Sequence, residues 1–522
     1  MTTTPGTRRA GRREWVGLAV LALACLLYVM DLTVLQLAIP QVSEALRPTS
    51  TQLLWIIDVY GFMVAGALVT MGTLGDRIGR RRLLLVGAAA FGLVSILAAF
   101  STTPEMLIAS RAFLGIAGAT IAPSTLSLIF HMFTDPKQRS AAVGVWIGAF
   151  SAGSAVGPVL GGVMLEHFWW GSVFLLALPV MGALLVLGPK VLPEYRDPDA
   201  GRLDVRSAAM SVVALLAVVY GVKQIAQDGI GGVPLLAIAV GLLVGVLWVR
   251  RQRRLPEPMI DVRLFRIRAF DAALLVNFLS IFVMVGYFLY IAQYLQLVMT
   301  MSPLEAGLWS LPSAVAFVVS SQLAPRFLAR VRPARTVAGG LAASAAGMLL
   351  LSTVEVDRGL SALIAASVVI AFGMGPVFGL TTEMVVGSAP AEKAGAASGV
   401  SETAAELGGA LGIAVLGSIG VAVYRSGVSA GLPTGVPDEA AQAARDTLGG
   451  AVGAAARLPG PAGTELLAEA RTAFVDGLQL TSAIAAGIAA VLAVVAAVAL
   501  RSVQATAPEE TEADEPEAVC AA

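Results

Sequence analysis

The sequence predicts an all-α, polytopic membrane protein, on the basis of its composition, its apolar segments and the placement of its charges. The chain has 522 residues, of which 57% are hydrophobic and 13% charged, whereas about 25% of a soluble domain is charged. Such a chain exposes most of its surface to lipid. The net charge of zero argues against nucleic acid as a partner. Cys25 and Cys520 lie too far apart in this topology for a structural disulfide.

Fourteen apolar segments approach or exceed the length of about 20 residues that a helix needs to cross the hydrocarbon core. Eight lie in the first half of the chain, at residues 15–39, 53–74, 83–101, 104–130, 140–165, 169–187, 205–225 and 233–248. Six follow, at residues 269–297, 303–324, 336–354, 360–386, 395–424 and 478–500. We expect each to form one transmembrane helix.

The basic residues follow the alternation that these helices impose. With the N-terminus inside, 27 of the 35 Lys and Arg residues lie on the cytoplasmic side and 7 outside, Lys223 among the latter. Cytoplasmic loops of membrane proteins carry this excess of positive charge. We therefore predict a multi-pass protein of the cell membrane with both termini in the cytoplasm. Residues 1–14 form a basic tail, and residues 501–522 form an acidic, disordered tail.

The connection at residues 425–477 is far longer than an ordinary loop. One helical run follows Pro437, with Asp438 and Glu439 in its first turn, where acidic residues favour a helix. A second run, with apolar residues at helical spacing, follows Pro461. We expect a short extracytoplasmic helical hairpin. A disordered Ala- and Gly-rich linker is the alternative, because such segments are only marginally helical.

The loop after the second segment reads Gly72-Thr73-Leu74-Gly75-Asp76-Arg77-Ile78-Gly79-Arg80-Arg81-Arg82. Its glycines permit a tight turn, and Asp76 at a helix end can bridge to a neighbouring helix terminus or arginine. Topogenic charge explains the arginine cluster but not the spacing. The loop resembles the signature loop of the major facilitator superfamily, which implies a gating role for Gly72, Asp76, Arg77, Gly79 and Arg81. It also implies the major facilitator fold, with two six-helix bundles at residues 15–187 and 269–500 and two inserted helices at residues 205–248.

The fifth segment carries small residues at regular intervals, namely Gly144, Gly153, Gly157, Pro158, Gly161 and Gly162. Glycines on one face allow close helix packing, and Pro158 bends the helix. Small-residue packing is common in membrane helices. This register, however, resembles the antiporter motif of drug:proton exporters, which implies an interface that hinges or seals the two halves.

Three further matches resemble the fourteen-helix drug:proton antiporters, the QacA-like and EmrB-like multidrug exporters. The run from Met30 to Pro40, which contains Asp31, resembles their first-helix motif, with Gln36 in place of the usual asparagine. The run from Trp55 to Tyr60, which contains Asp58, is similar to that of QacA-like exporters of lipophilic cations. Arg111 before Gly115 resembles their buried-arginine motif, although Leu114 replaces the usual glutamine.

Two carboxylates in the thirteenth segment, Glu402 and Glu406, are four residues apart and share one helix face. A charge in hydrocarbon costs at least ~2.5–3.5 kcal/mol, so intramembrane ionisable residues mark functional sites. Two carboxylates this close in a low dielectric do not both ionise easily. The pair can hold a proton and exchange it for a cation, which is the chemistry of antiport. The alternative is that both are solvated near the helix entrance.

Three more ionisable residues lie within predicted helices. We expect Asp31 to face a cavity and take part in protonation or cation binding, with an ion pair to Arg111 as the alternative. Asp58 is either a second cation site or a charge at the rim. Arg111 stays protonated at every relevant pH. It therefore has a structural or coupling role and does not carry the transported proton.

These features predict a proton-coupled antiporter that exports lipophilic, cationic drugs or toxic compounds by alternating access. It would work as a monomer, powered by the protonmotive force without a bound cofactor. Alternatives are a dedicated exporter of one endogenous metabolite or antibiotic and, more remotely, a membrane protein that transports nothing. The chain has two histidines, His131 and His167, and no Gly-Lys-Ser/Thr phosphate loop. An enzyme, a metal site and ATP-driven transport are therefore not expected.

Overall fold

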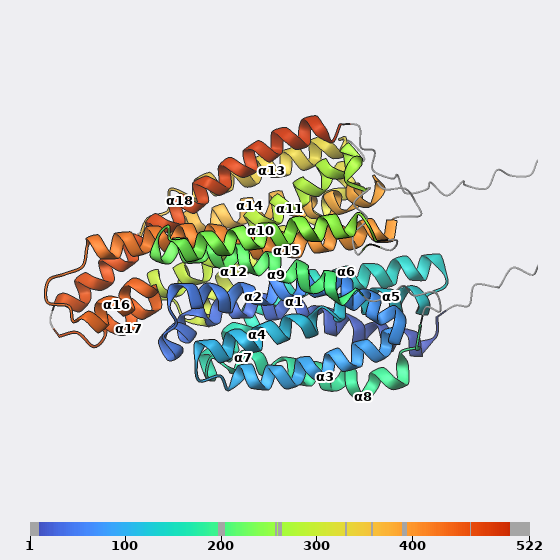
Figure 1. Cartoon of the computed structure of the whole chain (residues 1–522), viewed down its shortest axis with the longest axis horizontal. Coiled ribbons are helices and arrows are strands. Elements are labelled where there is room, and N and C mark those ends of the chain that lie inside the picture. The colour runs from blue at the N-terminus through green and yellow to red at the C-terminus, as the bar shows by residue number, and fades with distance from the viewer. Residues whose placement is uncertain are drawn as a thin grey trace, which may run out of the picture.

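The computed structural model describes residues 10–196, 204–255, 258, 264–328, 331–356, 359–388, 394–459 and 461–501. Within these ranges the regular elements are helices, most of them aligned along one direction (Figure 1). Thirteen spans are long and apolar enough to cross a membrane, and the 32-residue helix α6 (Pro136–His167) brings the number to fourteen. The prediction of an all-α membrane fold is confirmed. The predicted tails lie outside the described residues, apart from residues 10–14 and Arg501.

The first half of the chain forms one bundle, in which α1 packs on α6 and α2 packs on α4. Besides α6 it contains α1 (Arg12–Leu46), α2 (Ser50–Ile78), α3 (Arg80–Ala99), α4 (Pro104–Gly118), α5 (Ile121–Met132), α7 (Ser172–Leu175) and α8 (Ala177–Val191). The single helix expected at residues 104–130 is divided into α4 and α5. Pro123 lacks the N–H that would donate to the Ala119 carbonyl, so the helix is interrupted there.

The second half forms another bundle, in which α13 packs on α14 and α18, and α11 packs on α15. Its elements are η1 (Leu264–Arg266), α11 (Arg268–Gln293), the π-helical turn η2 (Tyr294–Val298), α12 (Pro303–Leu328), α13 (Pro333–Leu351), α14 (Leu360–Gly387), α15 (Ala394–Ala430) and α18 (Pro461–Ala499). Contacts of α12 with α6 and of α15 with α2 join the two halves.

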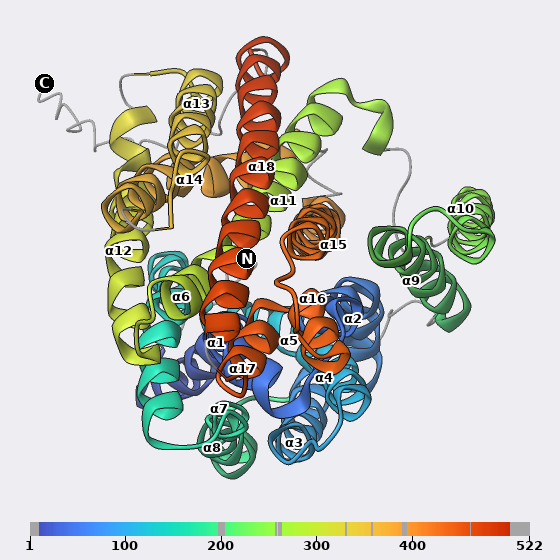
Figure 2. The ribbon, with the colours of Figure 1, turned by 90° about the vertical axis from the view of Figure 1, so that its left-hand side faces the viewer.

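Two inserted helices, α9 (Val205–Asp228) and α10 (Gly232–Gln252), stand at one side of the molecule (Figure 2). They pack on each other, and α9 also touches α2 of the first half and α15 of the second. α10 lies at the periphery, with only 11% of its most apolar stretch buried inside the protein. Among the described residues, the inserted pair therefore meets both halves mainly through α9.

The long penultimate connection is helical. It contains α16 (Asp438–Asp446) and α17 (Leu448–Ala455), which lie at the end of the bundle opposite the start of α1 and the end of α18 (Figure 1). We call this end of the bundle the hairpin end. We call the opposite end, which contains the start of α1 and the α2–α3 turn, the basic end. The second hairpin arm expected after Pro461 is instead the beginning of α18. Buried Leu466 and Phe474 continue the face of Leu478, and no proline separates them.

Contacts between the two halves gather near the hairpin end. Gln296 Nε2 of η2 donates to the Leu37 carbonyl of α1 at 2.9 Å. A methyl group on Gly417 of α15 would lie 2.8 Å from the Leu54 side chain of α2. Nearer the basic end, a methyl group on Gly144 or Gly399 would meet nothing within 4 Å. The structure is therefore closed at its hairpin end.

Candidate functional site

A buried ion pair between α1 and α4 holds the first half together. The Arg111 guanidinium lies 2.5 Å from the Asp31 carboxylate, and the Arg111 side chain is fully buried. Arg111 Nε donates to the Ile56 carbonyl at 3.3 Å, and the guanidinium lies 4.6 Å from the Tyr60 ring centroid. The arginine thereby connects α1, α2 and α4. For Asp31 the structure shows the ion-pair alternative and not an unpaired cavity carboxylate.

Backbone packing between α2 and α4 places Arg111 at this point. Gly115 lies one turn after Arg111, and a methyl group there would stand 2.5 Å from the Tyr60 carbonyl oxygen. Because glycine has no side chain, the two helices approach closely enough for Arg111 to reach across α2. The partial match to the buried-arginine motif, with Leu114 in place of glutamine, therefore retains the residues on which this geometry depends.

A side-chain hydrogen bond between α1 and α15 connects the two halves of the protein. Tyr28 Oη of α1 donates to Glu406 Oε1 of α15 at 2.6 Å. Tyr28 also packs against Tyr60, with ring centroids 6.1 Å apart, and Tyr60 in turn covers Arg111. Polar and aromatic contacts thus run from Glu406 through both tyrosines to the Arg111–Asp31 pair.

Glu402 lies one turn before Glu406, and both side chains are partly exposed. Their residues belong to the same face of α15, as their spacing predicted. Exposure lets a solute reach them, whereas the hydrogen bond from Tyr28 fixes the position of Glu406. The arrangement suits a carboxyl group that alternates between holding a proton and meeting a cation.

Asp58 has a partner that the sequence analysis missed. Lys223 of α9, expected outside the membrane, is fully buried, and its Nζ lies 2.8 Å from the Asp58 carboxylate. Asp58 is likewise buried and is not a rim charge. Lys223 lies within the apolar segment 205–225, and this placement was the signal that could have identified it.

The gating loop is held by a residue outside the motif. Gly79 joins α2 to α3 with φ +111°, which favours glycine. Arg81 forms an ion pair with Glu194 at 3.4 Å and donates to the Leu192 carbonyl at 3.0 Å. Arg77 is exposed. The loop is therefore attached to the segment that follows α8.

Gly72 of the gating motif takes no part in this attachment. Gly72 has the Pro123 side chain as its nearest neighbour, 3.9 Å from an added methyl group. The sequence predicts a bridge from Asp76 to a neighbouring helix terminus or arginine. The Asp76 side chain lies outside the part of the chain that the structure describes.

The antiporter motif makes α6 a backbone-to-backbone neighbour of two helices. A methyl group on Gly153 would lie 2.5 Å from the Leu26 carbonyl of α1, and one on Gly157 or Gly161 would also clash with α1. Gly162 faces the other half, and a methyl group there would lie 2.8 Å from the Leu304 Cα of α12. A methyl group on Gly307 of α12 would clash with the Pro158 carbonyl oxygen of α6. Except for Gly144, the motif forms the contact between α1, α6 and α12.

We expect Gly162→Ala to lower drug efflux about tenfold. Overpacking costs about 1–3 kcal/mol, and only the state closed at the hairpin end bears that cost, so its population falls. Gly144→Ala is the matched control, since a methyl group there meets nothing within 4 Å. Efflux rates in whole cells at equal expression measure both. Equal rates for the two variants would contradict the assignment of Gly162 to the closing contact.

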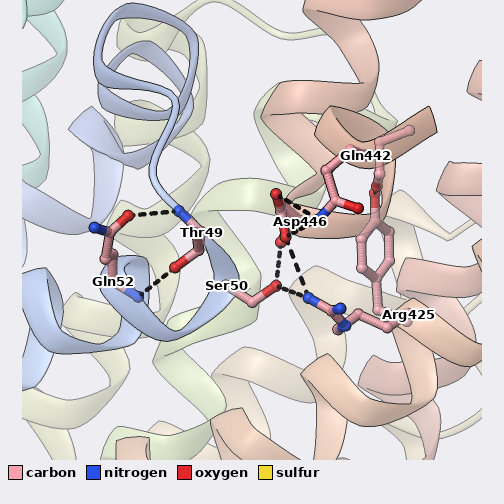
Figure 3. Close-up of polar contacts among 8 residues, drawn as sticks. Thr49, Ser50, Gln52, Arg425, Gln442 and Asp446 are labelled. Atoms are coloured by element: carbon pink, nitrogen blue, oxygen red, sulfur yellow. Dashed lines mark hydrogen bonds and ion pairs between the residues drawn. The ribbon is translucent and has the colours of Figure 1, made fainter. Parts of the chain in front are cut away.

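The hairpin is attached to both halves by a polar cluster (Figure 3). Ser50 Oγ of α2 donates to the Asp446 carbonyl at 2.6 Å, and Arg425 of α15 pairs with the Asp446 carboxylate at 3.1 Å. Gln442 also donates to that carboxylate. The adjoining cavity, lined in part by Tyr424, is about 50 Å³. It has room for a water molecule but not for a drug.

The pH dependence of hairpin docking follows from Asp446. Burial raises the pKa of this carboxyl, and Gln442 and Arg425 only partly oppose the effect. Its contribution to stability is thus present below the unfolded pKa of about 3.9 and is lost as the pH rises through the folded value. Hydrogen exchange of residues 438–455 should show more opening at pH 7 than at pH 4. Asp446→Asn should remove that difference and Asp438→Asn, at an exposed position, should retain it. An unchanged difference in Asp446→Asn would contradict the assignment.

Among the described residues, no three His, Cys, Asp or Glu side chains gather as metal ligands do.

Proteins of known activity resemble this chain over nearly all of its length. It is 46% identical over 498 residues to "Multidrug efflux pump LfrA" of Mycolicibacterium smegmatis, covering 95% of this chain and 98% of that protein. It is 37% identical to "Methyl viologen resistance protein SmvA" of Salmonella typhimurium, covering 89% and 93%. It is 31% identical to the "Tetracenomycin C resistance and export protein" of Streptomyces glaucescens, covering 94% and 93%.

The fold is also shared with a solved transporter. A bacterial homologue of the human lysosomal transporter Spinster, in an inward-facing and unoccupied conformation, superposes with a TM-score of 0.66 at 15% identity. The alignment covers 95% of this chain and 98% of that one. The family described as Major Facilitator Superfamily matches residues 21–413. Together with the signature loop, the antiporter motif and the two joined bundles, this match shows that the chain belongs to the major facilitator superfamily.

Proposed function

We propose that the protein exports lipophilic, cationic drugs across the cytoplasmic membrane in exchange for protons. The observation that carries the proposal is the Tyr28–Glu406 hydrogen bond, which places a partly exposed carboxyl group at the contact between the two halves. A second carboxyl, Glu402, lies one turn away. Such a group binds either a proton or a cationic drug, so the two compete for one site.

The exchange cycle follows from this competition. With the hairpin end closed, Glu406 releases its proton toward the basic end, and the carboxylate takes the positive charge of the drug. The halves then rock about the site, in the manner of alternating access. A proton arriving from the hairpin end displaces the drug and restores the Tyr28–Glu406 contact. Glu402 provides a second negative charge for a dication.

The remaining charges support this cycle without carrying cargo. The Arg111–Asp31 pair positions α1, which bears Tyr28, against α4. The protonmotive force, about 2.3 kcal/mol per charge per 100 mV, drives the cycle in a monomer without a bound cofactor. The basic end faces the cytoplasm together with both termini, because most arginines lie at that end.

The activities for which the relatives are named favour cationic substrates. Methyl viologen, named for the Salmonella relative, is a dication, and the relative with the highest identity quoted above is a multidrug pump. The Streptomyces relative, at 31% identity, favours a second candidate, a dedicated exporter of one antibiotic. A panel of substrates distinguishes the two.

The test uses purified protein in proteoliposomes that contain a pH-sensitive dye. We expect methyl viologen and tetraphenylphosphonium each to release protons into the compartment from which they bind. A neutral compound of similar size should release none. Cation transport without a proton signal would refute the coupling, and export of a single neutral compound would favour the dedicated exporter.

A further inference from the structure

A buried ion pair joins the inserted helix α9 to α2, and the exchange cycle does not use it. Lys223 Nζ lies 2.8 Å from both carboxylate oxygens of Asp58, and neither side chain is exposed. The same nitrogen lies 4.0 Å from the centroid of the Trp55 ring. One ammonium group thus meets a carboxylate and an aromatic face at once.

Packing alone does not account for these two charges. Only 17% of the most apolar stretch of α9 is buried inside the protein, yet Lys223 is among its most buried residues. Burying an ion pair costs several kcal/mol per ion, and apolar residues of similar volume often give equal or higher stability. An apolar residue at position 223 would attach α9 at lower cost. The pair therefore points to a role other than stability.

The chemistry of the site is that of a receptor for organic cations. A carboxylate neutralises the positive charge, and the face of a tryptophan ring attracts it through the ring quadrupole. Phe62 packs against Trp55, with ring centroids 6.3 Å apart, and extends the aromatic wall. The Lys223 side chain is itself an alkylammonium ion on a four-carbon stem, anchored to α9.

We propose that Trp55 and Asp58 form a second site for organic cations, and that Lys223 occupies this site as a built-in competitor. A drug cation that enters displaces the lysine, and the lysine displaces the drug in return. Exchange between the two costs little electrostatic energy, because the carboxylate is never left without a positive charge and the displaced ammonium, five residues before the end of α9, extends along its flexible stem to the water at that end. The identity of the ligand rests on the proposed function.

The site lies where three parts of the protein meet. Phe62 of α2, Val219 of α9, and Ala410 and Ala414 of α15 form one buried cluster. A methyl group on Gly61 would lie 3.3 Å from the Ala410 side chain. Displacement of Lys223 releases α9 from the first half at the contact with the second. Occupancy of the site is thereby coupled to the position of both halves.

The test is equilibrium binding of tetraphenylphosphonium to the purified full-length protein in detergent, with no proton gradient. We expect Lys223→Met to lower the apparent Kd about tenfold, because the apparent affinity of a site scales with the fraction of protein in which it is free. Asp58→Asn/Lys223→Met, a neutral pair of similar volume, should show no gain. Trp55→Leu/Lys223→Met should lose most of it. An unchanged Kd in a folded Lys223→Met variant would overturn the proposal.

A second measurement needs no substitution. Mass spectrometry after brief acetylation reports how accessible each lysine is, with exposed Lys190 as the reference. Tetraphenylphosphonium should raise acetylation of Lys223 several-fold and leave Lys190 unchanged, and equal labelling with and without the probe would refute displacement. Repeating the binding series in a Glu406→Gln background separates the two proposals. The gain from Lys223→Met should persist there, whether or not proton coupling through Glu406 is correct.

Discussion

Replacement of Glu406 by glutamine should lower cation-induced proton release about 100-fold. Glutamine has the same shape and its carbonyl accepts the hydrogen bond from Tyr28, so the fold is retained. It carries neither a titratable proton nor the negative charge that the drug cation needs. The loss corresponds to a charge-assisted contact of about 1.5–3 kcal/mol. Proton release from proteoliposomes measures it.

The matched control for this variant is Glu402→Gln, one turn away on the same face of α15. We expect a smaller loss for monocations than for dications, because Glu402 is assigned only the second charge. Thermal unfolding of each purified variant confirms that the protein is folded. Proton release at the wild-type rate in Glu406→Gln would remove this residue from the mechanism.

The second large effect concerns the stability of the buried Arg111–Asp31 pair. Arg111→Met leaves the Asp31 carboxylate in an apolar interior without its counter-ion, and Asp31→Asn leaves the guanidinium in the same position. Breaking a buried ion pair in this way costs about 3–5 kcal/mol. An unpaired carboxylate facing a cavity would tolerate Asp31→Asn, whereas the observed ion pair predicts a variant that is markedly destabilised. Thermal unfolding in detergent measures the loss.

The double variant Asp31→Asn/Arg111→Met separates charge from packing. It removes both ions together, so we expect its unfolding temperature to recover most of the loss. Arg47→Met is the control at an exposed pair, because Arg47 and Glu439 lie 3.7 Å apart with side chains 58% and 89% exposed. That variant should unfold at the wild-type temperature. A double variant no more stable than either single variant would show that the charges themselves contribute little.

The break near Pro123 and Thr120 was not predicted from the sequence. Length and apolarity identified residues 104–130 as one span. The interruption between α4 and α5 depends on a proline and on Thr120, whose hydroxyl donates to the Ala117 carbonyl at 2.7 Å. Conversely, α18 continues unbroken from Pro461 because its buried face does, whereas apolarity alone placed the span at residues 478–500. Helix ends depend on tertiary contacts more than helix cores do.

Placement within the apolar segments identified Asp31, Arg111 and Glu406 as ionisable residues of the helix bundle, but it missed the buried Lys223. It did not identify their partners. The Tyr28–Glu406 contact joins residues 378 positions apart, and the Lys223–Asp58 contact joins residues 165 apart. No local pattern records such distances. Glu194, which holds Arg81 of the gating loop, was missed for the same reason.

The amino-acid sequence by itself determined that most of the chain lies in a membrane, how many spans it has, which end is basic and which helix faces carry glycine. These properties follow from hydropathy, charge and periodicity within single segments. Only the tertiary structure decided which buried charge neutralises which, that α9 lies against both halves, and that Glu406 stands at their contact. In a low dielectric the energy of a charge is set by its nearest counter-charge. That neighbour is supplied by the packing of distant helices, which periodicity within one helix does not specify.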